Sequence, residues 1–156
     1  MMINSIDASS FDSGTAYIAG TRYKLGDFTP YLYVTDDYGK NWKPITDGIK
    51  DEHFTRVLRS DKSNKNILYA GTETGMYISY DRGNSWNEFQ KNLPIVPITD
   101  LTIKDNSLIV ATQGRSIWMI DDLTVIHQLT SSTEEAKLYK PKDSYRMRGA
   151  GGRKSL

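Results

Sequence analysis

A few polar segments of the chain carry residue types that the hydrolysis of a glycoside would use. Most glycoside hydrolases work with a pair of carboxylates on either side of the bond they cut. The catalytic candidates, chosen by residue type and position, are Tyr23, Asp27 and Glu73, and the ligand-binding candidates are Arg22, Glu73 and Arg115. None of these five residues stands in a catalytic motif of defined spacing, so the sequence holds no complete catalytic set.

Each candidate also has a plainer structural interpretation, which we favour. Glu73 stands in the segment Gly-Thr-Glu-Thr-Gly (71–75), and this composition is typical of a turn. Arg115 follows a glycine and could pair with a neighbouring repeat. The many tyrosines fit side-chain packing across β-strands better than a platform for sugar stacking.

The composition excludes several kinds of metal and thiol chemistry. There is no cysteine, so a disulfide framework, thiol catalysis and cysteine-ligated zinc are excluded. The only histidines are His53, in a polar loop, and His127, which has no evident partner. The aspartate pairs at 36–37 and 121–122 lack the further oxygen ligands that Ca²⁺ needs. We therefore expect no metal and no cofactor.

Charge is nearly balanced over the whole chain but not along it. The 156 residues contain 20 Lys and Arg against 19 Asp and Glu, which argues against nucleic-acid and membrane-surface partners. No apolar run is long enough for a membrane span, and the first ten residues lack a signal-peptide pattern. Residues 137–156 have a net charge of +6, and the preceding chain one of −5. We predict that residues 131–156 are a basic linker or tail, partly disordered.

The clearest feature of the sequence is an internal repeat. Residues 35–42 and 79–86 both read Ser/Thr-x-Asp-x-Gly-x-x-Trp, and their aspartates lie 44 residues apart. A degenerate third copy places an aspartate 41 residues further on, without the glycine and the tryptophan. The residues assigned to the motif are Thr35, Asp37, Gly39, Trp42, Ser79, Asp81, Gly83, Trp86 and Asp122.

Short apolar segments around each motif predict four strands per repeat. Such strands at a period of about 40–45 residues indicate the blades of a β-propeller. The predicted strands are 3–7, 15–20, 31–36 and 42–46 in the first blade; 54–60, 67–72, 76–80 and 86–89 in the second; and 98–104, 108–112, 117–121 and 125–128 in the third. The fold class is thus all-β, with blades at about 3–47, 54–90 and 97–129 in a partial propeller spanning 1–130.

The repeated motif has a folding explanation for every part. Gly39 and Gly83 supply the left-handed residue that a tight turn needs. Asp37 and Asp81 can accept hydrogen bonds from backbone N–H groups of the same turn. Each tryptophan begins an outer strand and can pack back over its hairpin.

The motif resembles the Asp-box, or BNR repeat, of sialidases, xyloglucanases, sortilin-type receptors and photosystem assembly factors. The segments 68–79, 92–94 and 111–122 are similar to the C-terminal blades of bacterial sortilin-like (VPS10-like) glycosyl hydrolase-type proteins. The resemblance implies a ring of about six to eight blades. This chain has material for three, so two chains could close one ring.

The resemblance also orders the functional hypotheses. It implies a glycan- or protein-binding module of a glycosyl hydrolase-like protein, commonly one that is exported. One alternative is part of a sialidase- or xyloglucanase-like active site that other blades or a second chain would complete. There, Tyr23 could be a nucleophile and Arg22 and Arg115 could bind a substrate carboxylate. The other alternative is a sortilin-like scaffold that binds a peptide. In propellers the loops between second and third strands usually form the functional face, which here includes residues 21–29, Glu73 and Arg115.

Overall fold

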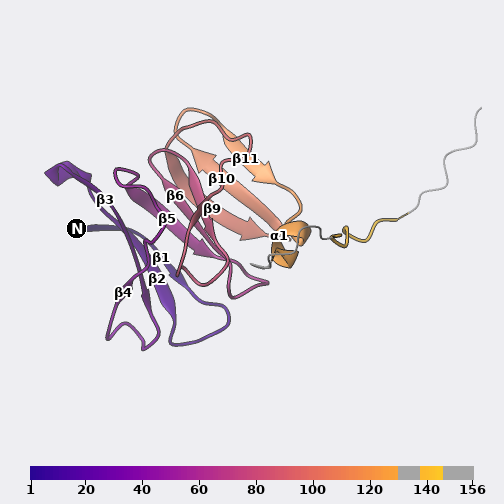
Figure 1. Cartoon of the computed structure of the whole chain (residues 1–156), viewed down its shortest axis with the longest axis horizontal. Helices are drawn as coiled ribbons and strands as arrows, with labels where there is room; N and C mark the ends of the chain where they lie inside the picture. The colour runs from indigo at the N-terminus through magenta and orange to yellow at the C-terminus, as the bar shows by residue number, and fades with distance from the viewer. Residues whose placement is uncertain (130–137, 146–156) are drawn as a thin grey trace, which may run out of the picture.

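The chain folds into three antiparallel β-sheets that stand side by side as propeller blades (Figure 1). The computed structural model describes residues 1–129 and 138–145. Blade 1 contains β1 (Met2–Ala8), β2 (Ala16–Arg22), the 3₁₀ helix η1 (Tyr23–Leu25), β3 (Asp27–Thr35) and β4 (Lys43–Pro44). Blade 2 contains β5 (Thr55–Ser60), β6 (Leu68–Thr72), β7 (Met76–Ser79) and β8 (Asn87–Glu88). Blade 3 contains β9 (Ile98–Lys104), β10 (Ser107–Thr112) and β11 (Ile117–Ile120), followed by helix α1 (Thr124–Gln128).

The first two blades confirm the predicted all-β fold of four-stranded antiparallel sheets. Their strands pair in chain order, β1-β2-β3-β4 and β5-β6-β7-β8, and each predicted strand overlaps an observed one. The outer strands β4 and β8 are only two residues long. The connection between β2 and β3 is shorter than the predicted loop 21–29, because Arg22 and Asp27 still pair across the ladder.

The predicted fourth strand of blade 3, at 125–128, is wrong, because these residues belong to α1. The carboxylate of Asp122 accepts a hydrogen bond from the backbone N–H of Thr124 at 2.9 Å, and the N–H of His127 donates to the carbonyl of Leu123. Leu123 and Ile126, three residues apart, are buried in the core. This spacing suits one face of a helical turn, whereas a strand would place the two side chains on opposite faces.

Blade 2 is the middle layer and is buried on both faces. Leu58, Ala70 and Tyr77 pack in a cluster with blade 1, while Tyr69 and Ile78 pack in a second cluster with blade 3. Alternation along each strand produces this division. The two end faces of the stack carry exposed apolar side chains, among them Ile6 (69% exposed) on blade 1 and Ile117 (72%) and Met119 (62%) on blade 3.

The two complete copies of the repeated motif form the same hydrogen-bonded turn. The hydroxyls of Thr35 and Ser79 accept the N–H of Gly39 and Gly83 at 2.9 and 2.8 Å. The hydroxyls donate to the aspartates at positions 37 and 81, which in turn accept the backbone N–H four residues on. Both glycines have left-handed φ angles, 83° and 90°. We call these the first and second aspartate turns (35–42 and 79–86).

The tryptophans of the two aspartate turns differ in environment. Trp86 is 4% exposed, and its indole Nε1 donates to the carbonyl of Ile45 in blade 1 at 2.7 Å. It lies in one buried cluster with residues of the preceding blade and of its own blade. Trp42 is 38% exposed, because no blade precedes it in the described residues.

The predicted tail, 131–156, lies mostly outside the described residues.

Candidate functional site

Two candidate side chains, Arg22 and Asp27, meet where β2 ends and β3 begins. Arg22 and Asp27 form an ion pair in which Nη1 and Oδ2 lie 3.3 Å apart. The hydroxyl of Tyr31 donates to Oδ2 of Asp27 at 2.7 Å, and the N–H of Thr29 donates to Oδ1. These hydrogen bonds, that of Tyr31 first, lower the pKa of Asp27 below its ordinary value. Asp27 is therefore held as an ionised acceptor, whereas a glycosidase acid needs a raised pKa.

Aromatic side chains join this connection to blade 2. The ring of Tyr23 stacks on Phe54 with centroids 5.2 Å apart and planes 14° from parallel. Phe28 meets the same ring in a tilted arrangement at 5.9 Å. Phe54 directly precedes β5 and is buried, so one phenylalanine of blade 2 anchors both aromatic residues of blade 1.

The same phenylalanine connects to Glu73. The guanidinium of Arg56 lies 5.4 Å from the centroid of Phe54, at cation–π distance, and forms an ion pair with Glu73. The backbone N–H of Glu73 donates to the carbonyl of Phe54 at 3.1 Å. Contacts thus run continuously from Tyr23 to Glu73. We call this set the interblade cluster: Arg22, Tyr23, Asp27, Phe28, Phe54, Arg56 and Glu73.

The interblade cluster includes three residues that the sequence reasoning missed. Phe54 and Arg56 make the contacts that connect Tyr23 with Glu73, and Phe28 packs on the same Phe54 ring. The ion pair of Arg22 and Asp27 flanks the short connection that carries Tyr23. A signal that could have found the site was Arg56, a charged residue in a strand whose neighbours Val57 and Leu58 are buried.

Arg115 lies apart from the interblade cluster. It is exposed on the connection between β10 and β11 in blade 3, and its carbonyl accepts a hydrogen bond from the indole of Trp118 at 2.7 Å. No hydrogen bond or ion pair of its guanidinium is seen within residues 1–129 and 138–145. The structure therefore does not bring this candidate to the others.

The two histidines have defined partners. Nδ1 of His53 lies 2.8 Å from the hydroxyl of Tyr77, beside an ion pair between Lys50 and Glu88. Nε2 of His127 lies 2.9 Å from Oδ2 of Asp61, a wholly buried carboxylate in blade 2. His127 therefore has the partner that the sequence did not reveal, and it attaches α1 to blade 2.

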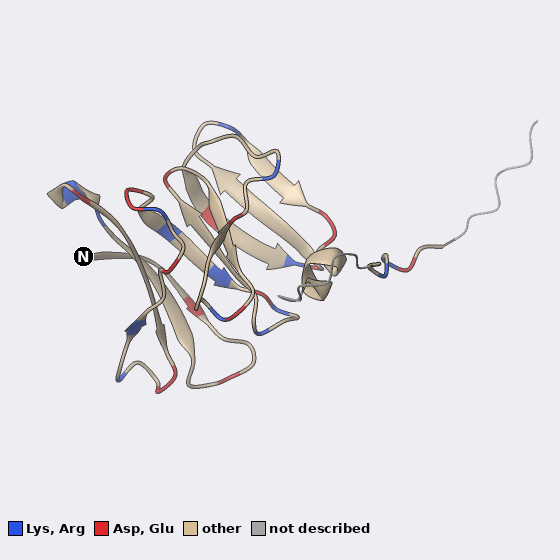
Figure 2. Ribbon diagram, in the orientation of Figure 1, with Lys and Arg blue, Asp and Glu red and all other residues tan. Residues whose placement is uncertain are grey.

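The described part of the chain shows neither a metal cluster nor a spanning helix. Within it, no three His, Cys, Asp or Glu side chains gather closely enough to hold an ion. No described helix combines the length and the apolar character needed to cross a membrane. Basic and acidic segments lie interspersed on the ribbon (Figure 2).

Comparison with known families finds one match over most of the chain. The Sortilin-Vps10 family, described as sortilin, neurotensin receptor 3, matches residues 31–146. A vacuolar protein sorting/targeting protein 10 of the fungus Pyrenophora tritici-repentis is 35% identical over 66 residues. These residues are 42% of this chain and 4% of that protein, so the match spans a small fraction of the relative's length.

Solved structures with a similar fold are β-propellers. A GH74 enzyme from Niastella koreensis superposes with a TM-score of 0.61 at 13% identity, covering 77% of this chain and 21% of the enzyme. YCF48 from Cyanidioschyzon merolae superposes with a TM-score of 0.54 at 18% identity, covering 78% of this chain and 34% of that protein. Identities this low establish the fold alone, and the fold is a propeller segment.

Proposed function

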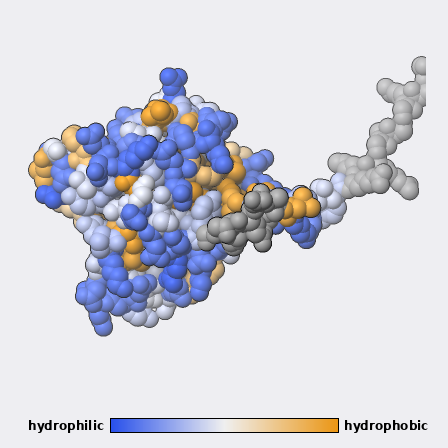
Figure 3. All heavy atoms as spheres, viewed as in Figure 1, coloured by the Kyte–Doolittle hydropathy of each residue, from blue (hydrophilic) through white to orange (hydrophobic). Residues whose placement is uncertain are grey.

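Because this chain belongs to the Sortilin-Vps10 family, we propose that it is a propeller segment that binds protein or peptide ligands through the interblade cluster. The observation that carries the proposal is a pair of exposed apolar side chains beside a buried phenylalanine. Phe28 of the cluster is 47% exposed and lies against the buried Phe54, and Leu25 in the adjoining η1 is 71% exposed. Figure 3 shows a hydrophobic patch at the end of the molecule where η1 lies in Figure 1.

The charged groups of the interblade cluster favour binding over catalysis. Arg22 pairs with Asp27 and Arg56 pairs with Glu73, so each carboxylate has a cation beside it. An aromatic residue such as Phe28, supported by side chains that are already ordered, offers a ligand contact area at a small cost in conformational entropy. Hydrogen bonds lower the pKa of Asp27, whereas acid catalysis would need a raised one.

The family supports a protein or peptide ligand over a glycan. The family's description names a neurotensin receptor, and the fungal relative is named for protein sorting. The GH74 likeness supports only the fold, so a role in glycoside hydrolysis has less support.

A binding screen with a matched pair of variants tests the proposal. The purified chain is applied to an array of random peptides and to a glycan array, and we expect peptides alone to be retained. The double substitution Leu25→Ser and Phe28→Ser should weaken peptide binding at least tenfold, or about 1.4 kcal/mol. Ile95→Ser, which changes an equally exposed apolar residue (78%) elsewhere, should leave it unchanged. Retention of glycans alone, or equal losses in both variants, would reject the proposal.

A further inference from the structure

The outer edge of blade 3 lacks the strand that covers the same edge in blades 1 and 2. Strands β4 and β8 pair with β3 and β7, while β11 is the outermost strand of its sheet among the described residues. An unpaired strand edge presents a row of backbone donors and acceptors to another chain.

The direction of these backbone groups follows from the repeat. In blade 2 the N–H of Thr72 donates to the carbonyl of Gly75, and the next carbonyl, that of Met76, accepts from Phe89 just after β8. In blade 3 the N–H of Thr112 donates to the carbonyl of Ser116 in the same way. Since residues alternate along an antiparallel ladder, the N–H and C=O of Ile117 and Met119 point to the open edge.

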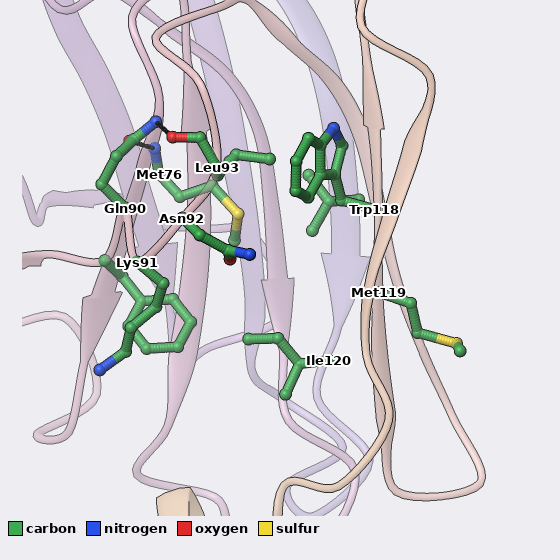
Figure 4. Close-up of a pocket in the computed structure, with 10 residues that line it drawn as sticks. Met76, Gln90, Lys91, Asn92, Leu93, Trp118, Met119 and Ile120 are labelled. Atoms are coloured by element: carbon green, nitrogen blue, oxygen red, sulfur yellow. Dashed lines mark hydrogen bonds between the residues drawn. The ribbon is translucent and has the colours of Figure 1, made fainter.

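A groove between blades 2 and 3 accompanies this edge (Figure 4). It is lined by Met76, Phe89, Leu93, Val110, Trp118 and Ile120. Figure 4 shows Trp118 and Ile120 directed toward Met76 and Leu93, while Met119 points away.

The groove repeats the surroundings of Trp86 one blade further along. Aligning the two aspartate turns equates Leu32, Ile45 and Ile49 with Met76, Phe89 and Leu93. Aligning the second turn with Asp122 equates Tyr77 with Trp118, and their cross-strand partners, Ala70 and Val110, are then equivalent in the ladder. The first set packs around Trp86, whose indole donates to the carbonyl of Ile45. No described group donates to the equivalent carbonyl, that of Phe89.

The two observed outer strands show what would fill such a site. Their sequences are Trp42-Lys-Pro-Ile45 and Trp86-Asn-Glu-Phe89. Each pairs through its two central residues, and the residue after them, Ile45 or Phe89, is buried toward the next blade. In the second, the tryptophan fills the gap to the preceding blade.

We propose that β11 and this groove bind an extended peptide segment of another polypeptide, with the pattern Trp-x-x-Phe or Trp-x-x-Ile. The segment adds antiparallel to β11 as the fourth strand of blade 3. Its tryptophan enters the groove between Trp118 and Leu93 and donates its indole N–H to the carbonyl of Phe89. The N–H of its Phe or Ile donates to the carbonyl of Ile117.

A synthetic peptide with the sequence of residues 84–90, Asn-Ser-Trp-Asn-Glu-Phe-Gln, tests this proposal. Fluorescence anisotropy of the labelled peptide with the full chain should show saturable binding. Replacing its Trp by Ser should abolish binding at the same concentrations. N-methylation of its Phe removes the N–H that faces β11 and should weaken binding about five- to tenfold. N-methylation of its Glu, whose N–H faces away from β11, is the matched control and should have little effect.

Variants of the chain test the edge from the other side. Met119→Pro removes an N–H directed to the open edge, on an exposed position where the ladder to β10 does not use it. It should weaken binding about five- to tenfold, while Met119→Ala should not. Absence of binding, or equal binding of the two N-methylated peptides, would overturn the proposal even if the proline variant fails to fold. Sedimentation with and without the peptide shows whether the peptide displaces a second copy of the chain. If it does, the edge of β11 binds the second copy, and the proposal is overturned as well.

Discussion

At the residue scale, the carboxylate of Asp81 fastens the second aspartate turn. Burial acts to raise the pKa of Asp81, but the hydrogen bonds from Ser85 and Ser79 outweigh it and lower the pKa below its ordinary value. A carboxyl group whose pKa is lower in the folded than in the unfolded state stabilises the folded protein at pH values above the unfolded-state pKa. This contribution disappears as the pH falls from the unfolded pKa, near 3.8, through the lower folded pKa.

We therefore expect the free energy of unfolding to fall with acidification below about pH 4, partly through Asp81. Asp81→Asn, which keeps an acceptor oxygen but loses the titration, should flatten this dependence in urea unfolding measured from pH 5 to pH 2.5. Asp143→Asn, at a side chain 94% exposed, should leave the curve unchanged. Parallel curves for the wild type and Asp81→Asn would contradict the assignment.

A second residue-scale prediction concerns the buried carboxylate of Asp61. It accepts hydrogen bonds from Tyr69, from His127 and from two backbone N–H groups of its own turn. His127→Ala removes one partner of a group that water does not reach, so it should cost about 1–3 kcal/mol in chemical denaturation. Val125→Ala, at an exposed position of the same helix, should change stability by less than about 0.5 kcal/mol. Equal effects would mean that the ion pair does not hold α1.

At the element scale, the two aspartate turns are a natural matched pair. Trp86 sits between two blades and Trp42 on an open face, although the local sequences and hydrogen bonds agree. Trp86→Phe should destabilise the chain by about 1–3 kcal/mol, since it loses buried contacts and leaves the carbonyl of Ile45 without its donor. Trp42→Phe should cost less than about 0.5 kcal/mol. Thermal unfolding of both variants measures the two losses of stability. A larger loss for Trp42→Phe than for Trp86→Phe would show that the face carrying Trp42 is covered in solution.

The strands show how much of the fold could be predicted from the sequence. Eight strands were found from apolar alternation within each blade and from the repeat that relates the two blades. The ninth to eleventh strands followed from apolar segments around the degenerate third copy, and the prediction of the twelfth was wrong. The third copy lacks the glycine and the tryptophan, and Asp122 accepts the N–H of Thr124, the first residue of α1, instead.

The interblade cluster was only half predictable for a related reason. Residue type and loop position indicated Tyr23, Asp27 and Glu73, which lie on the same face of consecutive blades. The stacking of Tyr23 on Phe54 and the pairing of Arg56 with Glu73 depend on how two blades pack, which no local pattern encodes. Arg115 occupies the equivalent loop of blade 3, where its carbonyl accepts the indole N–H of Trp118.

At the scale of the whole molecule, the three blades form an arc with two different apolar ends. Blade 1 exposes Ile6 and Trp42, and blade 3 exposes Ile117 and Met119. Because the ends differ, contact between copies would be head-to-tail, and such contacts close into a ring only if the rotation per copy fits. Blade 2, in the middle of the stack, buries an apolar face against each neighbouring blade. The exposed apolar faces of blades 1 and 3 favour burial against a further blade in the same way.

We expect the isolated chain to self-associate through these ends, and sedimentation velocity over a range of concentrations measures it. Ile6→Glu places a charge on the end of blade 1, so it should shift the distribution to the monomer by at least tenfold in dissociation constant. Ile95→Glu adds the same charge at a residue 78% exposed beside blade 2, away from both ends, and should leave association unchanged. A chain that stays monomeric at every concentration would refute closure by a second copy. The exposed ends would then be left to blades of a longer polypeptide, which the small covered fraction of the Vps10 relative also accommodates.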